Sequence, residues 1–310
     1  MFLPDPKLQA ELHGQFLGHF FLVTLMTVAT FIDFDEQSIP DVVTIPGTII
    51  GLLGAAFVPG WLGFNSGLTP TGEMLFEMDA IAPNAWMMWL NGTWGLYFGI
   101  AIILVWAFAL LDRRIILRRG MKKAFVYFIA RLLRPHWLWK VVVVVGAALI
   151  VGVVMAWNDQ IARWQYLLSS LFGLACAGGI TWAVRISASA ALRAQALGFG
   201  DVTLMAMIGT YVGWQPSILI FFIAPLMAVL IVVIQYLLTG EKAAPYGPYL
   251  CAATVALIVG WSALWFGWAK PVFSLGLTIL EILAACVIMM GAMLWHFLQW
   301  RVPVRSPPVS

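Results

Sequence analysis

Residues 216–238 read PSILIFFIAPLMAVLIVVIQYLL, an apolar run that contains no charged side chain. A helix crosses the hydrocarbon core of a bilayer with about 20 consecutive apolar residues, so this run predicts a transmembrane helix. The whole chain has the same character: 62% of its 310 residues are hydrophobic, only 10% are charged, and its mean hydropathy is +0.94. A soluble domain carries about 25% charged residues. We therefore predict an all-α fold, a polytopic bundle of transmembrane helices.

The apolar runs of the chain predict about nine spans. The sixth is short, and Pro216 stands where a tight turn between the sixth and seventh spans would place a proline. Residues 1–14 lack the basic start and small-residue cleavage site of a signal peptide, so we expect the first span to be retained. The predicted spans are 15–32, 43–60, 95–111, 141–157, 166–184, 202–214, 216–238, 249–268 and 272–298.

The Lys and Arg residues predict how these spans are oriented, since cytoplasmic loops carry an excess of positive charge. If the first span runs from outside to inside, 14 of the 17 Lys and Arg residues lie on the cytoplasmic side. We therefore expect the N-terminus outside and the C-terminus inside, in a multi-pass protein of the cell membrane.

The segment 113–140 is a basic insertion in which apolar residues are interleaved with Lys and Arg. This pattern is typical of an amphipathic helix lying on the anionic inner leaflet, so we expect a contact with anionic lipid, with partner binding as the alternative. Topology explains the basic residues, and we predict no nucleic-acid binding. The segment 61–94 is rich in Trp, as expected of an outer loop near the membrane interface.

Two acidic segments stand at the ends of predicted spans. Residues 32–41 read IDFDEQSIPD and follow the first span, whereas residues 197–201 read LGFGD and precede the sixth. A carboxylate beside hydrocarbon is costly, and two carboxylates at the same membrane depth can share one proton and activate a water. The predicted topology places Asp33, Asp41 and Asp201 together on the cytoplasmic side.

Each acidic segment also has a plainer interpretation. Asp35 and Glu36 fit a solvated loop, and Asp201 fits a cap on the helix that follows a glycine turn. The functional interpretation rests on Gly198 and Gly200, which let the backbone approach another chain closely. An extended peptide could then form hydrogen bonds beside Asp201.

Other kinds of catalytic site find little support in the sequence. Cys176, Cys251 and Cys286 stand singly in apolar runs without a C-x-x-C pair, which predicts neither disulfides nor zinc. The four histidines form no H-E-x-x-H, and no G-x-S-x-G accompanies a suitable histidine. We therefore predict no metal and no cofactor.

Three sequence blocks carry a family resemblance. The first joins ID at 32–33 to IPD at 39–41 and TIP at 44–46, and the second is LGFGDVTLMAMIG at 197–209 followed by GW at 213–214. The third is APYGPYL at 244–250. In this order the blocks resemble the type IV prepilin peptidase family, GxGD-type intramembrane aspartic peptidases related to the archaeal preflagellin peptidases.

The resemblance implies a membrane-embedded aspartic endopeptidase that cleaves the leader of type IV prepilin-like or pseudopilin proteins at the cytoplasmic face. Such enzymes serve type IV pili and protein secretion. The implied catalytic pair is Asp33 and Asp201. The implied supporting or substrate-binding residues are Asp41, Gly198, Gly200, Pro245, Gly247 and Pro248.

The resemblance also divides the chain. Residues 1–60 and 166–268 are expected to form the two parts of the peptidase core, with 61–165 as an insertion and 269–310 as an additional span and tail. Bifunctional members of the family carry two C-x-x-C pairs associated with N-methylation, and this chain has none. We therefore expect cleavage without methyl transfer.

Two other functions stay open at the level of the sequence. One is a non-catalytic scaffold that keeps the peptidase fold, and the other is an ion- or proton-coupled transporter. A transporter needs acidic residues deep within spans, and Glu281 is the one good candidate away from the aspartate face. The oligomeric state is not predicted.

Overall fold

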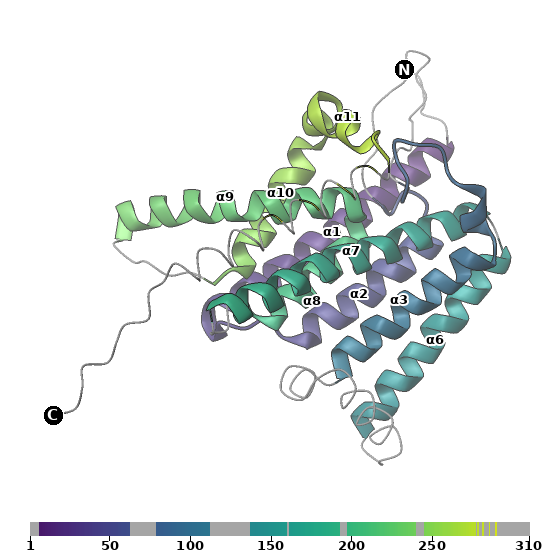
Figure 1. Cartoon of the computed structure of the whole chain (residues 1–310), viewed down its shortest axis with the longest axis horizontal. Coiled ribbons are helices and arrows are strands. Elements are labelled where there is room, and N and C mark those ends of the chain that lie inside the picture. Colours follow the sequence, from purple (N-terminus) through teal and green to yellow (C-terminus); the bar gives the residue numbers. More distant parts are fainter. Residues whose placement is uncertain are drawn as a thin grey trace.

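The described part of the chain is helical, as Figure 1 shows, and contains no strand. The all-α fold predicted from composition is therefore confirmed for these residues. The computed structural model describes residues 6–62, 79–111, 137–159, 161–192, 197–239 and 245–276, together with the single positions 278, 281, 285 and 289.

Helices occupy eight of the nine runs that the sequence predicts as spans, while most of the ninth run, 272–298, lies outside the described residues. In chain order the elements are α1 (Pro6–Glu36), α2 (Asp41–Phe57), the 3₁₀-helix η1 (Met88–Asn91), α3 (Thr93–Leu111), α6 (Trp137–Asp159), α7 (Ile161–Leu192), α8 (Phe199–Val212), α9 (Trp214–Thr239), α10 (Gly247–Leu264), the π-helical turn η2 (Trp265–Ala269) and α11 (Lys270–Phe273).

Five segments are long and apolar enough to cross a membrane, so the chain has the character of a multi-pass membrane protein. They are Gln9–Glu36, Thr93–Leu110, Arg163–Ser189, Trp214–Ile234 and Gly247–Phe273. The other apolar helices are shorter. At 1.5 Å per residue, the 14 residues of α8 extend about 21 Å, less than the roughly 30 Å of a hydrocarbon core. Nine spans and their orientation stay predictions.

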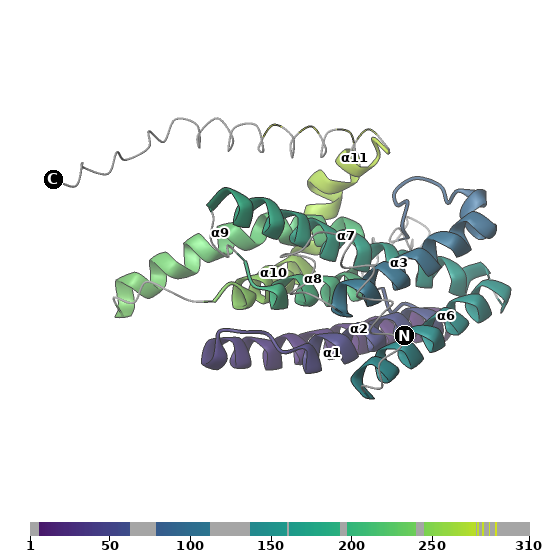
Figure 2. The same cartoon turned by 60° about the horizontal axis from the view of Figure 1, so that its bottom comes forward.

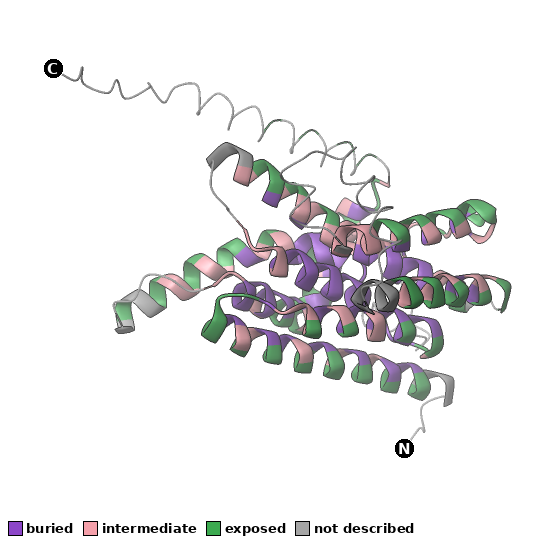
Figure 3. Ribbon diagram, turned by 90° about the horizontal axis from the view of Figure 1, so that it is seen from below, coloured by how far each residue is buried: buried purple, intermediate pink, exposed green. Residues whose placement is uncertain are grey.

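Helix α8 lies at the centre of the molecule and contacts α1, α2, α7, α9 and α10. Figure 2 shows α8 between the layer of α1 and α2 and the layer that contains α7, and in Figure 3 buried residues gather in this middle region. All residues from Asp201 to Val212 are buried. A helix that is apolar on all sides is stable only where protein or lipid surrounds it, and here the protein does.

The pairing of α7 with α8 depends on two glycines that face each other. A Cβ atom built on Gly173 would collide with the carbonyl oxygen of Gly209, and one built on Gly209 would collide with that of Gly173. Nearby, the Ser170 hydroxyl donates a hydrogen bond of 2.7 Å to the Thr210 carbonyl. Small residues and such a bond are the means by which helices associate inside a membrane.

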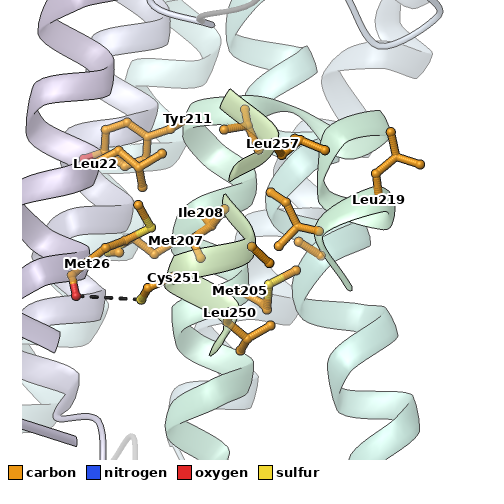
Figure 4. Packing of buried hydrophobic residues seen from close by; sticks show 14 of the residues in the cluster. Leu22, Met26, Met205, Met207, Ile208, Tyr211, Leu219, Leu250, Cys251 and Leu257 are labelled. Atoms are coloured by element: carbon orange, nitrogen blue, oxygen red, sulfur yellow. Dashed lines mark hydrogen bonds between the residues drawn. The ribbon is translucent and has the colours of Figure 1, made fainter. Parts of the chain in front are cut away.

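The other side of α8 packs against α1, α2 and α10. Figure 4 shows Leu22 and Met26 of α1 facing Met207 and Tyr211 of α8 and Cys251 of α10. The Tyr211 hydroxyl donates a 2.9 Å hydrogen bond to the carbonyl of Gly47 in α2. This buried phenol is satisfied by backbone, which ties α2 to the central helix.

Tryptophan indoles close the end of the bundle opposite to Asp201. The Trp164 indole donates to the Leu90 carbonyl at 2.7 Å, Trp157 donates to the Asn91 carbonyl at 2.9 Å, and Trp214 donates to the Ala80 carbonyl at 2.6 Å. The described part of the Trp-rich segment, 79–94, is therefore fixed to α6, α7 and α9. Residues 63–78 lie outside the described residues, and contact of this loop with the membrane interface stays a prediction.

Two further sequence expectations concern the turn between α8 and α9 and the basic segment 113–140. The turn between α8 and α9 is made by Gly213, with φ of +80°, and Pro216 lies in the first turn of α9, where a proline is tolerated. Of the basic segment 113–140, residues 113–136 lie outside the described residues, and 137–140 begin α6. The division of the chain at 60, 165 and 268 stays a prediction.

We predict that Gly173→Ala destabilises the bundle, because the new methyl group must push α7 away from the α8 backbone. The free energy of unfolding should fall by about 1–3 kcal/mol, as for overpacked cores. Gly179→Ala in the same helix is the matched control, since a Cβ there meets nothing within 4 Å. Thermal unfolding of the purified chain in detergent measures both variants. Equal stabilities would contradict the role of this contact.

Candidate active site

Asp33 lies in the last turn of α1 and is buried, with 4% of its surface exposed. The helix ends just beyond it because Gln37 adopts a left-handed conformation, with φ of +51°, and donates its N–H to the Asp33 carbonyl at 3.0 Å. Pro40 is extended and precedes the first residue of α2, Asp41. This short connection fixes the direction in which the chain leaves Asp33.

Asp201 lies in the first turn of α8 and is also buried, with 7% exposed. Its Oδ2 atom accepts the N–H of Gly198 at 3.1 Å, and the Thr203 hydroxyl donates to the Gly200 carbonyl at 3.0 Å. The carboxylate therefore does cap the start of its helix, as the plainer interpretation predicts. The same bond fixes the orientation of a buried acid, so capping and catalysis are compatible roles here.

The third sequence block reaches the first through a backbone hydrogen bond. The N–H of Gly247 donates to Oδ2 of Asp33 at 3.2 Å, joining residues 214 positions apart in the chain. Gly247 is the first residue of α10, and Pro248 follows it in the first helical turn, where the missing N–H of a proline costs nothing. Pro245 lies half-buried two residues before α10.

Ile39 connects all three blocks, and it requires two glycines to do so. A Cβ on Gly200 would lie 2.8 Å from the Ile39 Cβ and 2.9 Å from its carbonyl oxygen. A Cβ on Gly247 would lie 2.5 Å from Oδ2 of Asp33 and 2.7 Å from Cδ1 of Ile39. A side chain at either position would collide with these atoms, so close packing explains Gly200 and Gly247.

The electrostatics of the site tie Asp33 to Asp201. Asp201 lies outside the five candidate spans. Burial, and next the nearby Asp33 carboxylate, raise the pKa of Asp201 to about 7, against smaller opposing effects of the Gly198 N–H and the Arg185 guanidinium. Burial and the charge of Asp201 likewise raise the pKa of Tyr246 to about 12, so this phenol stays protonated and able to donate a hydrogen bond.

The remaining acidic residues of the first block differ from this pair. Asp35 and Glu36 are exposed at the end of α1, in agreement with a solvated position, although they are helical and not in a loop. Asp41 is half-buried at the start of α2, where a negative charge complements the helix dipole. Its supporting role stays a prediction.

Three residues that contact the site were not among those predicted for it. Ile39 packs against two glycines that are distant in the sequence, so the residues around it do not predict this contact. Tyr246 stands between Pro245 and Gly247 in the third block, and this position was the signal that could have indicated its place at the site. Arg185 is one of the 14 basic residues that the charge count places on the cytoplasmic side, and its Nε–H donates to the Leu197 carbonyl at 2.9 Å.

Across the described ranges, no group of three or more His, Cys, Asp or Glu residues is arranged to hold a metal ion. What the arrangement offers is a pair of buried carboxyl groups with one elevated pKa. The Asp201 carboxyl can gain or lose a proton near neutral pH, and in a pair with one proton one member can accept a proton from water while the other donates a hydrogen bond.

Comparison with known proteins supports the resemblance that the second block carries. A model of the type IV leader peptidase family matches residues 129–233. This part of the chain is similar to the type IV leader peptidases. It contains Asp201 and both glycines of the LGFGD sequence, whereas Asp33 and Gly247 lie outside the matched residues. The resemblance inferred from the three blocks is confirmed at this level.

A curated relative gives the same result over a similar length. The chain is 29% identical over 104 residues to a protein of Pseudomonas aeruginosa described as "Prepilin leader peptidase/N-methyltransferase". The aligned part is 33% of this chain and 32% of the relative, so the chain spans about a third of the length of that relative. No solved structure matches the chain.

We predict that a hydrophobic carbodiimide, which reacts with protonated carboxyl groups, labels Asp201 in a pH-dependent way. The carboxyl is protonated below its pKa and ionised above it, so labelling should be strong at pH 5, half-maximal near pH 7 and weak at pH 9. Peptide mass spectrometry of the purified chain locates the label. Asp201→Asn should abolish it and Asp159→Asn, at the opposite end, should not. Half-maximal labelling near pH 4 would contradict the environment described here.

Proposed function

We propose that the chain is an aspartic endopeptidase that removes the leader of type IV prepilin-like proteins at the cytoplasmic face of the inner membrane. The observation that supports this proposal is that two buried carboxyl groups from motifs 168 residues apart in sequence, Asp33 and Asp201, are near enough for the charge of Asp33 to act on Asp201. The similarity of residues 129–233 to the type IV leader peptidases supports the same activity.

In the proposed reaction the pair begins with one proton shared between its members. The ionised carboxylate takes a proton from a water molecule, whose oxygen attacks the scissile carbonyl. The protonated carboxyl donates a hydrogen bond to that carbonyl and stabilises the negative charge of the tetrahedral intermediate. As the intermediate collapses and its C–N bond breaks, a protonated carboxyl of the pair gives a proton to the leaving nitrogen, which releases the leader and leaves a new amino terminus. The proton belongs to the pair and not to one named residue.

The surroundings of the pair suit an extended peptide. Gly198 and Gly200 are half-buried beside Asp201, and we propose that an extended substrate forms main-chain hydrogen bonds along this segment. In the resembled family the substrate carries a short basic leader before an apolar helix. Asp35 and Glu36 are exposed a few residues from Asp33, and their negative charge would attract such a leader.

We further propose that cleavage occurs without N-methylation of the product. The curated relative is named for both activities, but it is aligned with this chain over 104 residues only. The three cysteines here form no C-x-x-C pair, and two of them, Cys176 and Cys251, lie within α7 and α10. The motif associated with methyl transfer in the resembled family therefore has no counterpart in this chain.

The first prediction of the proposed function concerns the pair itself. Asp33→Asn and Asp201→Asn should each lower the rate of leader removal by about 10²–10⁴-fold, because each removes one proton-transferring group. Cleavage by the unmodified chain should decline above about pH 7, where the shared proton is lost. Coexpression with prepilin-like proteins of the same genome, followed by gel shift and N-terminal mass spectrometry, measures both cleavage and methylation.

Asp159→Asn is the matched control, since this exposed aspartate pairs with Arg163 at the other end of the bundle. Full cleavage by either Asp33→Asn or Asp201→Asn, at equal membrane levels, would refute the aspartic mechanism. A methylated product would refute the absence of methyl transfer. A chain that cleaves none of the candidate prepilins would point to the scaffold interpretation.

A second prediction concerns the glycine that contacts Asp33. In Gly247→Ala the new methyl group would lie 2.5 Å from Oδ2 of Asp33 and must displace the carboxylate. Misplacement of a reacting group by about 1 Å can cost 10²-fold in rate, so cleavage should fall by about 10- to 100-fold. Gly260→Ala in the same helix is the control, because its Cβ meets nothing within 4 Å. Equal cleavage rates for both variants would contradict the contact described between Gly247 and Asp33.

A further inference from the structure

Arg185 lies near the C-terminal end of α7 and is buried, with 9% of its surface exposed. Its Nε–H donates a hydrogen bond of 2.9 Å to the Leu197 carbonyl. The central carbon of its guanidinium lies 5.3 Å from the centre of the Phe199 ring, within the range of a cation–π contact. A buried charge near a membrane is costly, so a residue held this way is expected to have a role.

The two contacts of Arg185 fix the residues on both sides of Gly198. Leu197 and Phe199 flank Gly198, whose N–H is the donor that orients the Asp201 carboxylate. Glycine restricts the backbone less than any other residue, so the Gly198 N–H is directed only if its neighbours are fixed from outside. Arg185 provides this restraint from a different helix, through a planar group suited to stacking and to directed hydrogen bonds.

The charge of Arg185 acts on the same carboxyl group. Its attraction for the Asp201 carboxylate opposes the effects of burial and of Asp33, and so keeps the pKa of Asp201 lower than it would otherwise be. In the described part of the chain, the titratable groups that face Asp201 from other elements are Asp33 of α1, Tyr246 before α10 and Cys251 of α10. None of these supplies a positive charge.

We propose that Arg185 is a positioning residue of the site, which fixes the turn from Leu197 to Asp201 and balances the negative charge of the two aspartates. Its effect on cleavage rests on the proposed peptidase function. Its effect on Asp201 does not, because it follows from the contacts alone. The matched family region, residues 129–233, contains Arg185, so the residue stands in the part of the chain that is similar to the leader peptidases.

Three substitutions separate the two effects of Arg185. Arg185→Gln keeps a hydrogen-bond donor and removes the charge, so half-maximal carbodiimide labelling of Asp201 should move up by about one pH unit from its value near 7. Arg185→Lys keeps the charge and loses the planar group, so the midpoint should stay near 7 while kcat falls by about 10-fold. Phe199→Leu removes the ring under the guanidinium, so Arg185 is held less firmly near Asp201. A smaller upward shift of the labelling midpoint is expected.

Arg163→Gln is the matched control, because Arg163 lies in the same helix and pairs with Asp159 at its exposed opposite end. It should leave both the labelling midpoint and the cleavage rate unchanged. An unchanged midpoint in both Arg185→Gln and Phe199→Leu, or an equal shift in Arg163→Gln, would overturn the proposal. If Arg185→Gln does not fold, Phe199→Leu still decides the direction of the shift.

The labelling experiment needs no substrate, and this separates the two proposals. A chain that cleaves no prepilin but shows the expected shifts would refute the peptidase function and support the positioning role. A chain that cleaves prepilins with unaltered midpoints in the variants would support the peptidase and refute the role of Arg185.

Discussion

The backbone contact between Gly173 of α7 and Gly209 of α8 is the constraint on which the rest of the molecule depends. It draws α8 into the centre, where every residue from Asp201 onward is buried. Lipid offers no hydrophobic drive for helices to associate, so close packing of this kind and hydrogen bonds such as Ser170 to Thr210 must hold the bundle. Asp201 is buried because α8 lies in the centre of the bundle.

Backbone, more than side chains, stabilises the candidate site. Asp33 accepts the N–H of Gly247, Asp201 accepts the N–H of Gly198, and Ile39 fills the space that Gly200 and Gly247 leave. An unpaired polar group in a medium of low dielectric is costly, so these donors offset part of the cost of burying the two acids. The raised pKa of Asp201, about 7, lets this carboxyl gain or lose a proton near neutral pH, as proton transfer requires.

The sequence could predict the helices and the residues of the pair, but not what holds them together. Runs of apolar residues located eight helices, since lipid exposure and helical backbone bonding leave few alternatives. Helix ends were less predictable: α7 continues to Leu192, beyond the predicted 184, because the alanine-rich residues 185–192 also favour helix. The contacts of Ile39 and Arg185 depend on which helices lie side by side, and the order of residues along one helix does not contain that information.

The two ends of the bundle are closed by different chemistry. At the far end, neutral indoles of Trp157, Trp164 and Trp214 bind loop carbonyls, and no change of pH alters these bonds. At the aspartate end, the Gly198 N–H binds the carboxyl group of Asp201, whose charge varies near neutral pH. Protonation can therefore change the bonds at the aspartate end of the bundle, while the bonds at the tryptophan end stay the same.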